Sequence, residues 1–472
     1  MNILAVGLCA LAAADGSFAQ TACEDTRVTA SDSGVFESFG YAVGVWADTA
    51  LIGAQWDREL GTEAGAAYIF ELDRQGQAWV ESQKLMASDG AAGNHFGRAA
   101  AIDGDTAMIT ATSHLHDGAG GNGSVYVFDY NGTAWTEQQE LIASDGAIGD
   151  VFGRSVSISG DVALIGAPGD DDNGSGSGSA YLFRFDPGTS QWIEDTKLTA
   201  SDAAVADNFG LAVGVSGDTV VIAAPGSDDG CPDGVNCNTG AAYVFRYDPE
   251  TSRWVEQEKL LASDGAAFDG FGLSVSISGE VALIGAHGDG FSSGSAYVFR
   301  FDPENWQWVE EQKLLASDGA VFDQFGRAVA IDGDTLVIGA FDHEDDGPVF
   351  GAVYIFRFDP AGSGSWIEQQ KLLPNPNPWT NFFGWSVAID GDTAVIGAYG
   401  EDQQAGAAYV FDLTACLCTA DLDGDGNVGI LDLLALLAAW DTEPGGPPDF
   451  DGDGTVGILD LLELLANWGA CP

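Results

Sequence analysis

One pattern of apolar and polar positions recurs along most of the chain. A representative copy reads FGRSVSISGDVALIGA at 152–167, and its leading Phe-Gly pair returns at spacings of 54 to 62 residues. The seven phenylalanines of these pairs are Phe39, Phe96, Phe152, Phe209, Phe271, Phe325 and Phe383. A period of this length indicates a solenoid, an array or a propeller, so it constrains the fold more strongly than any local feature.

Each repeat predicts four β-strands. In the third repeat they are expected at Ser155–Ile158, Val162–Gly166, Ser179–Phe183 and Trp192–Leu198, which are rich in β-branched and aromatic residues and end at Gly, Asp, Pro or Ser. A Ser-Gly-Asp or Asp-Gly-Asp turn joins the first two strands as a hairpin. Four strands repeated seven times indicate an all-β, seven-bladed propeller.

The first strand of each repeat alternates small and apolar residues. In the fifth repeat Ser274 and Ser276 share one face, and Val275 and Ile277 share the other. The innermost strands of a propeller crowd its axis, so small residues on one face allow neighbouring blades to approach. We therefore expect this strand to be the innermost one.

The two ends of the repeat region complement each other. The seventh repeat stops after its third strand, at Phe411, whereas Arg27–Asp32 matches the end of a fourth strand and the loop after it. We expect the N-terminal strand to complete the last blade, which would remove the open edges of the ring.

These repeats resemble the FG-GAP repeats of integrin-α-like propellers, from residue 23 to about 414. Phe-Gly is retained in all seven repeats, and the Gly-Ala-Pro element is complete at Gly166–Pro168. The family often carries a calcium loop between its first two strands. Here that turn is too short to surround an ion with six or more oxygens, so the resemblance implies the fold without that calcium site.

Charge narrows the choice of partners. The chain has 72 Asp+Glu and 16 Lys+Arg, a formal net charge of −56, while 46% of its residues are hydrophobic. Such a surface repels nucleic acid and anionic lipid headgroups. The apolar content is enough for a large core. Nucleic acid is therefore excluded as a partner, and the acidity is typical of a soluble exported protein.

The N-terminus resembles a secretory signal. Ile3–Ala14 is almost wholly apolar and Ser17-Phe18-Ala19 has the form of a cleavage site, although no Lys or Arg precedes the apolar run. No later segment is long and apolar enough to span a membrane. We expect a signal peptide at 1–19, the propeller at 20–415 and a third region at 416–472, in a secreted or cell-surface bacterial protein.

Six cysteines remain once Cys9 is removed with the signal. An even number in an exported chain favours disulfides. The expected pairs are Cys231 with Cys237, Cys23 with Cys416 or Cys418, and the remaining one of these with Cys471.

Two segments of the C-terminal region have the spacing of a calcium loop. The expected ligands are Asp421, Asp423, Asp425, Asn427 and Asp432 in the first loop, and Asp449, Asp451, Asp453, Thr455 and Asp460 in the second. Alternate oxygens face one hard cation, and Gly426 or Gly454 allows the sharp turn between them. Two copies in the same register make chance a poor explanation, so we predict calcium as the cofactor.

Each loop leads into an expected helix, Ile430–Trp440 or Ile458–Trp468. The arrangement resembles a dockerin type I module over 419–472, which implies a cohesin-like or cell-surface protein partner. It departs from many dockerins at Ile430-Leu431 and Ile458-Leu459, where they carry small hydroxyl residues. The helices are apolar nearly all round, so some leucines should stay exposed, either to dock a partner or to pack onto the propeller.

An enzyme is the alternative class. The histidines are His95, His114, His116, His287 and His343. His114-Leu-His116 could seat a metal and His343-Glu-Asp-Asp could supply an acid–base pair, but solvated acidic loops are the favoured interpretation. No Gly-x-Ser-x-Gly, Walker or His-Glu-x-x-His pattern occurs. We favour a non-enzymatic binding or adhesion protein, with a polysaccharide-acting enzyme or enzyme-complex subunit as the alternative.

Three further sets of residues recur with the repeat. Arg98, Arg154 and Arg327 directly follow Phe-Gly, and they either hold an anionic ligand or, as we prefer, pair with a loop Asp. The Asp of each Ser-Asp loop either forms cation sites or, as we prefer, caps its turn. The fourth-strand Trp is expected to pack the blades. These two sets are Asp32, Asp89, Asp145, Asp202, Asp264 and Asp318, and Trp79, Trp135, Trp192, Trp254, Trp308 and Trp366. The propeller loops are expected to bind a glycan or a protein.

Overall fold

A computed structural model describes residues 24–74, 78–114, 121–229, 237–344, 351–360, 363–374, 382–413, 427–440, 456–466 and 468–470. The chain divides into two compact units, one spanning Cys23–Ala415 and the other containing Cys416–Pro472. None of the described helices is long and apolar enough to cross a membrane.

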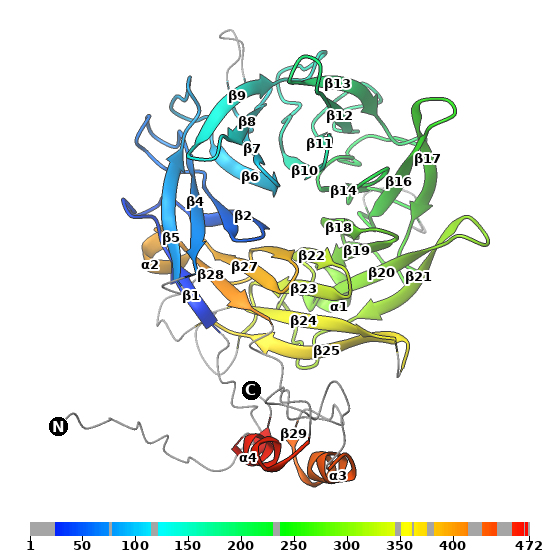
Figure 1. The fold of residues 1–472 in the computed structure, drawn as a ribbon. Coiled ribbons are helices and arrows are strands. Elements are labelled where there is room, and N and C mark those ends of the chain that lie inside the picture. The colour runs from blue at the N-terminus through cyan, green and yellow to red at the C-terminus, as the bar shows by residue number, and fades with distance from the viewer. Residues whose placement is uncertain are drawn as a thin grey trace, which may run out of the picture. The chain divides into compact units, whose positions relative to one another are not determined.

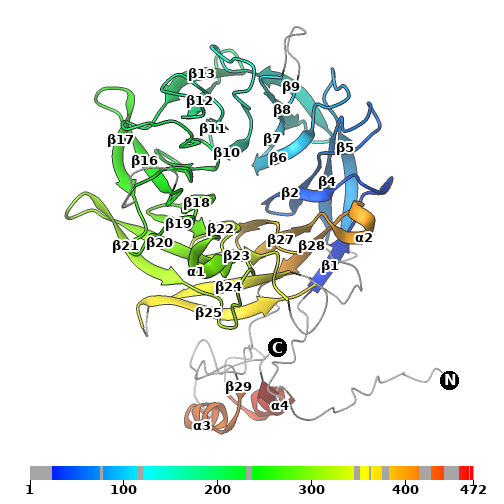
Figure 2. The same ribbon diagram turned by 180° about the vertical axis from the view of Figure 1, so that it is seen from behind.

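The larger unit is a ring of seven four-stranded antiparallel sheets (Figures 1 and 2). Blades one to three consist of β2 (Phe39–Trp46), β3 (Thr49–Ala54), β4 (Ala66–Asp73) and β5 (Ala78–Leu85); β6 (Phe96–Asp103), β7 (Thr106–Ala111), β8 (Ser124–Tyr130) and β9 (Trp135–Leu141); and β10 (Ser155–Ser159), β11 (Val162–Ala167), β12 (Ser179–Asp186) and β13 (Gln191–Leu198).

Blades four to six consist of β14 (Val213–Ser216), β15 (Thr219–Ala224), β16 (Ala241–Asp248) and β17 (Arg253–Leu260); β18 (Ser274–Ser278), β19 (Val281–Ala286), β20 (Ser295–Asp302) and β21 (Gln307–Leu314); and β22 (Ala328–Asp332), β23 (Thr335–Ala340), β24 (Ala352–Asp359) and β25 (Ser365–Leu372). Blade seven contains β26 (Ser386–Asp390), β27 (Thr393–Ala398) and β28 (Ala407–Asp412). The seven blades and four strands per repeat confirm the predicted architecture.

Three strands of the third repeat lie within one residue of the predicted bounds, and β12 differs more. β12 runs three residues past the expected end at Phe183, because Arg184 pairs with Ile193 and Asp186 with Gln191 on the far side of a register shift. The third-to-fourth hairpin is therefore longer than its buried apolar part.

The fourth strand of blade seven comes from the other end of the chain. β1 (Glu24–Val28) pairs antiparallel with β28, opposing Thr26 to Val410 and Val28 to Ala408. Its Arg27 lies 2.7 Å from the Glu401 carboxylate. Two one-turn segments, α1 (Asp289–Ser292) and α2 (Glu401–Gln404), have left-handed residues at their centres and are irregular turns.

The hydrophobic core lies between the blades. In one interface Phe209 packs edge-on against Tyr243 and Phe245, with ring centroids 5.4 and 6.1 Å apart. The glycine after it has φ +90°, and a Cβ there would lie 2.2 Å from the Ser179 carbonyl oxygen, so only glycine fits. The fourth-strand tryptophans are buried in these interfaces, which confirms their packing role.

The innermost strands approach one another through small side chains, as predicted. Ser155 donates a hydrogen bond from Oγ to the Gly210 carbonyl of the next blade at 2.9 Å, and Ser274 does the same to Gly326 at 2.8 Å. Across the junction of the chain ends, Ser386 donates to Gly40 at 3.0 Å. The serines therefore tie neighbouring blades together near the axis.

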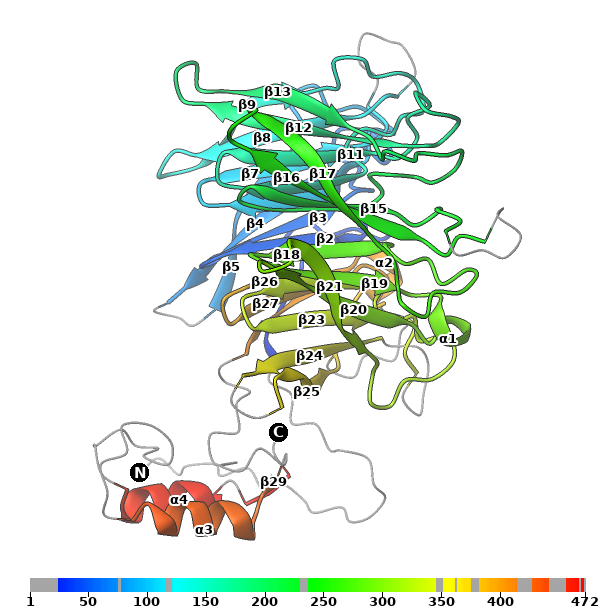
Figure 3. The same ribbon diagram turned by 90° about the vertical axis from the view of Figure 1, so that its right-hand side faces the viewer.

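The C-terminal unit contains two short helices that lie side by side (Figure 3), α3 (Ile430–Ala438) and α4 (Ile458–Ala466), and a two-stranded ladder of β29 (Asn427–Val428) with β30 (Gly469–Ala470). Both helices end before the expected tryptophan. In α3 the last turn tightens, because the Trp440 N–H reaches the Leu437 carbonyl. The hydrophobic core of the C-terminal unit consists of Val428, Leu436, Val456 and Leu464, which are buried.

Candidate binding site at the axial end of the propeller

One face of the propeller carries the residues that are candidates for ligand binding. Because the strands of a blade alternate in direction, the innermost strand begins and the second strand ends on this face, here named the Phe-Gly face. Two sets of seven residues result. Those after Phe-Gly are Tyr41, Arg98, Arg154, Leu211, Leu273, Arg327 and Trp385, and those after the second strand are Gln55, Thr112, Pro168, Pro225, His287, Phe341 and Tyr399.

The three arginines of this face have no carboxylate partner within the described part of the chain. Arg98 donates from Nη1 to the Gln55 amide oxygen at 3.1 Å, and its Nε is buried without a hydrogen-bond partner. The expected pairing of these arginines with a loop Asp is therefore wrong. Burial, and then the charges of Arg98 and Arg327, lower the pKa of Arg154 to about 10. The three cations lie close enough to repel one another.

Aromatic rings stand beside these guanidinium groups. The ring centroids of Trp385 and Tyr399 are 4.8 Å apart, and Tyr41 lies 5.5 Å from Trp385. The guanidinium carbon of Arg327 lies 4.3 Å from the Trp385 centroid, and that of Arg98 lies 5.7 Å from Tyr41. Blades one and seven thus supply aromatic faces next to a concentration of positive charge.

His287 belongs to the same group. Burial, followed by the charge of Arg327, lowers the pKa of His287 to about 4, so its imidazole is neutral at pH 7. Its Nδ1 is buried without a hydrogen-bond partner among the described residues. The axial end therefore offers guanidinium donors, one neutral imidazole and aromatic rings, which suits a ligand that carries both an anionic group and a flat apolar face.

Seven polar clusters surround this axial group. In blade three the ammonium of Lys197 lies 2.8 Å from Asp145 and 2.7 Å from Asp170, and the Tyr181 hydroxyl donates to Asp145 at 2.7 Å. Burial opposes the charge on Lys197, but its carboxylate hydrogen bonds outweigh burial and raise its pKa.

The same set recurs in blades one, four and five around Lys84, Lys259 and Lys313. The Asp of the Ser-Asp loop thus joins an ion pair in blades one, three, four and five, and Asp318 does so with Lys371, which corrects its interpretation as a turn cap.

Three blades vary this cluster. Blade seven uses Arg27 with Glu401, and the Tyr409 hydroxyl donates to Glu401 at 2.7 Å. Blade six replaces one carboxylate by His343, whose Nε2 lies 2.7 Å from Lys371. Blade two has His114 and Glu140 at these positions. His95 contacts Glu63 and Ser113 instead, while His116 lies outside the described residues.

The predicted calcium ligands are described only in part. Asp432 and Asp460 are buried and accept hydrogen bonds from the backbone N–H groups of Gly429 and Gly457, each at 2.6 Å. Asn427 lies in β29. The remaining ligands, Asp421, Asp423, Asp425, Asp449, Asp451, Asp453 and Thr455, lie outside the described residues. The same holds for the signal segment and for Cys23, Cys231, Cys416, Cys418 and Cys471, so these assignments stay predictions.

The fold and this face define the class of a repeat-built β-propeller suited to ligand binding. The FG-GAP repeat profile matches residues 23–70, 79–128, 135–183, 192–245, 254–299, 308–356 and 366–411, and the chain belongs to the FG-GAP repeat family. Each matched repeat begins at the fourth strand of one blade and ends in the third strand of the next.

Solved structures with a similar arrangement include a protein from Lactobacillus plantarum, at 15% identity over 71% of this chain and 85% of that chain, with a TM-score of 0.48. A Bacteroides fragilis protein that bears the provisional name 6-phosphogluconolactonase has 12% identity over 71% and 84%, with a TM-score of 0.47. Saccharomyces cerevisiae Sqt1 has 11% identity over 83% and 99%, with a TM-score of 0.44. No curated protein matches the chain.

Proposed function

We propose that this chain is a secreted bacterial binding protein whose propeller holds an anionic ligand at the axial end of the Phe-Gly face. The observation that carries the proposal is that Arg98, Arg154 and Arg327 stand together without a carboxylate partner among the described residues, in a chain with 72 Asp+Glu and 16 Lys+Arg. Mutual repulsion of the three guanidinium groups opposes folding, and a bound anion would offset it.

The neighbouring aromatic rings favour a glycan that carries carboxylate groups. A guanidinium binds a carboxylate through two parallel hydrogen bonds, and the faces of Tyr41 and Trp385 provide apolar surface for a sugar ring. The formal charge of −56 repels a long polyanion, so a short oligosaccharide or one chain end is the expected ligand.

Uronic-acid oligosaccharides and their neutral counterparts, titrated by calorimetry, test this proposal. Arg154→Leu is the matched variant, because Leu211 and Leu273 occupy the equivalent position in blades four and five. We expect at least a tenfold loss of affinity, about 1.4 kcal/mol or more. The control is Arg74→Ala, at an exposed ion pair with Asp48. Equal binding of neutral and acidic oligosaccharides would contradict the proposal, and breakdown of the oligosaccharides would favour the enzyme alternative.

The C-terminal unit is proposed to attach the propeller to a surface or assembly in a calcium-dependent way, as a dockerin-like module that docks a cohesin-like protein. Its helices carry exposed apolar side chains that support docking. These are Ile430, Leu431, Leu434, Leu437, Ile458, Leu459, Leu462 and Leu465, each 47 to 69% exposed.

Calcium should fold this unit, because about fifty residues give only a marginal core and the acidic loops repel themselves without a cation. Titration of residues 416–472 should raise the helical circular dichroism, and Asp421→Ala with Asp449→Ala should abolish the gain. Residues 20–415 serve as the control and should change little. Full helicity in excess chelator would contradict calcium-dependent folding.

A further inference from the structure

We propose that blade two holds a divalent transition-metal ion of the zinc class between Asp89, His114 and Glu140. This site lies in the polar cluster of its blade, apart from the arginines of the axial group, and it does not depend on the proposed glycan binding. The sevenfold repeat of the fold supplies the internal comparison that carries the argument.

The comparison concerns one position in the fourth strand. Five of the other blades have a lysine there and blade seven has Arg27, so six clusters contain a cation of the protein itself. The lysines are Lys84, Lys197, Lys259, Lys313 and Lys371. Blade two has Glu140, which exchanges a positive charge for a negative one at the centre of the cluster. The carboxylate that follows the second strand in blades one, three and five is replaced as well, by His114.

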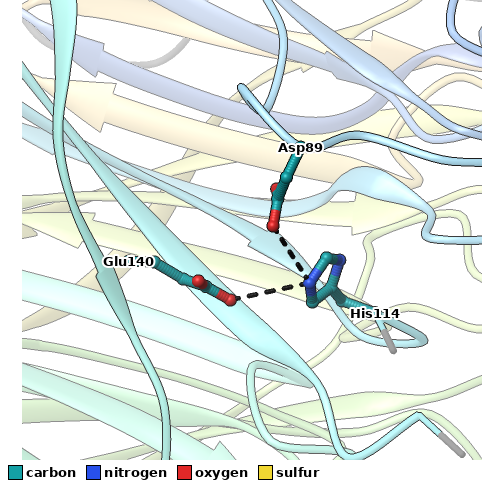
Figure 4. Close-up of side chains that lie close together, drawn as sticks. All are labelled: Asp89, His114 and Glu140. Atoms are coloured by element: carbon teal, nitrogen blue, oxygen red, sulfur yellow. Dashed lines mark ion pairs between the residues drawn. The ribbon is translucent and has the colours of Figure 1, made fainter. Parts of the chain in front are cut away.

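The side chains of Asp89, His114 and Glu140 point toward one another (Figure 4). Nε2 of the buried His114 lies 3.3 Å from Asp89 Oδ2 and 3.7 Å from Glu140 Oε1, and these three atoms all lie within 4.8 Å of one another. Zinc bonds to nitrogen and oxygen of about 2.0–2.1 Å place two tetrahedral ligands about 3.4 Å apart. The observed separations require only small side-chain adjustments to reach that geometry.

Neighbouring groups support the three ligands. The Asn94 amide nitrogen Nδ2 lies 2.6 Å from His114 Nδ1, the ring nitrogen that faces away from the carboxylates. In this orientation Asn94 donates to Nδ1 and the imidazole proton is on Nε2, so a metal would displace that proton. Exchange of the Asn94 amide oxygen and nitrogen would instead hold the proton on Nδ1 and leave the Nε2 lone pair for a metal. The Tyr126 hydroxyl donates to Asp89 at 2.7 Å, and the Ser124 hydroxyl donates to Glu140 at 2.6 Å. Two ligands are thus oriented by hydroxyl groups.

The donor set selects the kind of ion. One imidazole and two carboxylates suit zinc and its neighbours among the first-row metals, whereas calcium takes six to eight oxygens. Blade six separates the contribution of the histidine from that of the lysine. Its His343 occupies the same position as His114, but Lys371 remains 2.7 Å from the imidazole and holds the place that a metal would take. A histidine alone therefore does not make the site.

The test is zinc titration of the full chain by calorimetry, after removal of bound metal and with excess calcium to occupy the acidic loops. The wild type should bind one more equivalent of zinc than Glu140→Lys, which restores the lysine of the other blades. His114→Asp, which restores the carboxylate of blades one, three and five, should weaken zinc binding at least tenfold. His343→Asp in blade six is the control and should leave zinc binding unchanged.

Lys371→Glu should add a second equivalent, because it converts blade six to the residues of blade two. Cobalt bound at the blade-two site should give visible absorption, and Glu140→Lys should remove that absorption. Zinc binding of wild-type strength and stoichiometry in folded Glu140→Lys and in His114→Asp would overturn the proposal. It would mean that His114 serves only as an ion-pair partner of the two carboxylates.

Discussion

The cations of this propeller occupy two contrasting environments. In four of the seven polar clusters around the axial group, here called the outer clusters, a lysine such as Lys197 contacts two or more carboxylates, whereas the arginines of the axial group contact none that the structure describes. Basic residues are rare in the chain, so their distribution is informative. The lysines hold the blades and loops together. The guanidinium groups of Arg98, Arg154 and Arg327 are not neutralised by any described carboxylate, which is consistent with the proposed binding of an anionic ligand.

The strongest test of the outer clusters is removal of the strand that brings Arg27 to blade seven. Deleting residues 20–33 exposes the edge of β28 and leaves Glu401 buried without its guanidinium partner. We expect the free energy of unfolding to fall by about 5 kcal/mol, with a lower thermal midpoint. Arg27→Lys is the control and should cost far less. An unchanged midpoint in the deletion would mean that the strand adds nothing to the ring.

A single lysine gives the next largest effect. Lys197→Met keeps the length of the side chain but leaves the buried Asp170 without a cation, at a cost of about 3 kcal/mol measured by denaturant unfolding. The Lys197 and Tyr181 hydrogen bonds outweigh burial and lower the pKa of Asp145 below 3.8. The stabilisation that the Asp145 carboxylate contributes is therefore complete above pH 3.8 and is lost as the pH falls through the lowered pKa of Asp145. Lys197→Arg should retain most of it.

The axial arginines should behave in the opposite way. Arg154→Leu removes a cation that repels Arg98 and Arg327 and makes no ion pair with the described residues, so the unfolding free energy should stay within about 0.5 kcal/mol or rise. A loss as large as that of Lys197→Met, in the same unfolding experiment, would show that the axial and outer cations serve the same structural role.

The last expected effect is confined to acidic pH and concerns His287. Its folded pKa of about 4 lies below the ordinary 6.5, so the unfolded chain takes up a proton first as the pH falls, and stability declines from pH 6.5 toward 4. His287→Gln, which introduces the residue that blade one carries as Gln55, should remove about 1 kcal/mol of this decline. A bound anion should raise the pKa of His287, which carbon-13 NMR of the imidazole can follow. An identical pH profile in the variant would contradict the assignment.

The sequence was sufficient to predict the blades, because Phe-Gly, the short turns and the small residues of the innermost strands are constraints within one repeat or between adjacent repeats. It did not reveal the role of the Ser-Asp loops. Their Ser144 and Asp145 meet Glu194 and Lys197 about fifty residues away, contacts that only the closed ring creates.

The predicted ion pairs of Arg98, Arg154 and Arg327 with a loop Asp were wrong for the same reason, because the acidic residues nearby in sequence lie elsewhere in space. One signal was available and was missed. Alignment of the seven fourth strands places Glu140 where five of them carry lysine. The calcium loops lie outside the described residues, so the structure does not test them.

The matched repeats are out of step with the blades, and this offset bears on how such a chain can evolve. A segment that starts at Trp79 and ends at Phe128 supplies the outer strand of one blade and three strands of the next. Tandem duplication of one such segment would add four strands, each with a partner already in place, and the chain ends would still meet in a shared sheet. Gain or loss of a blade could therefore occur in a single genetic event without an intermediate that exposes an unpaired edge to aggregation.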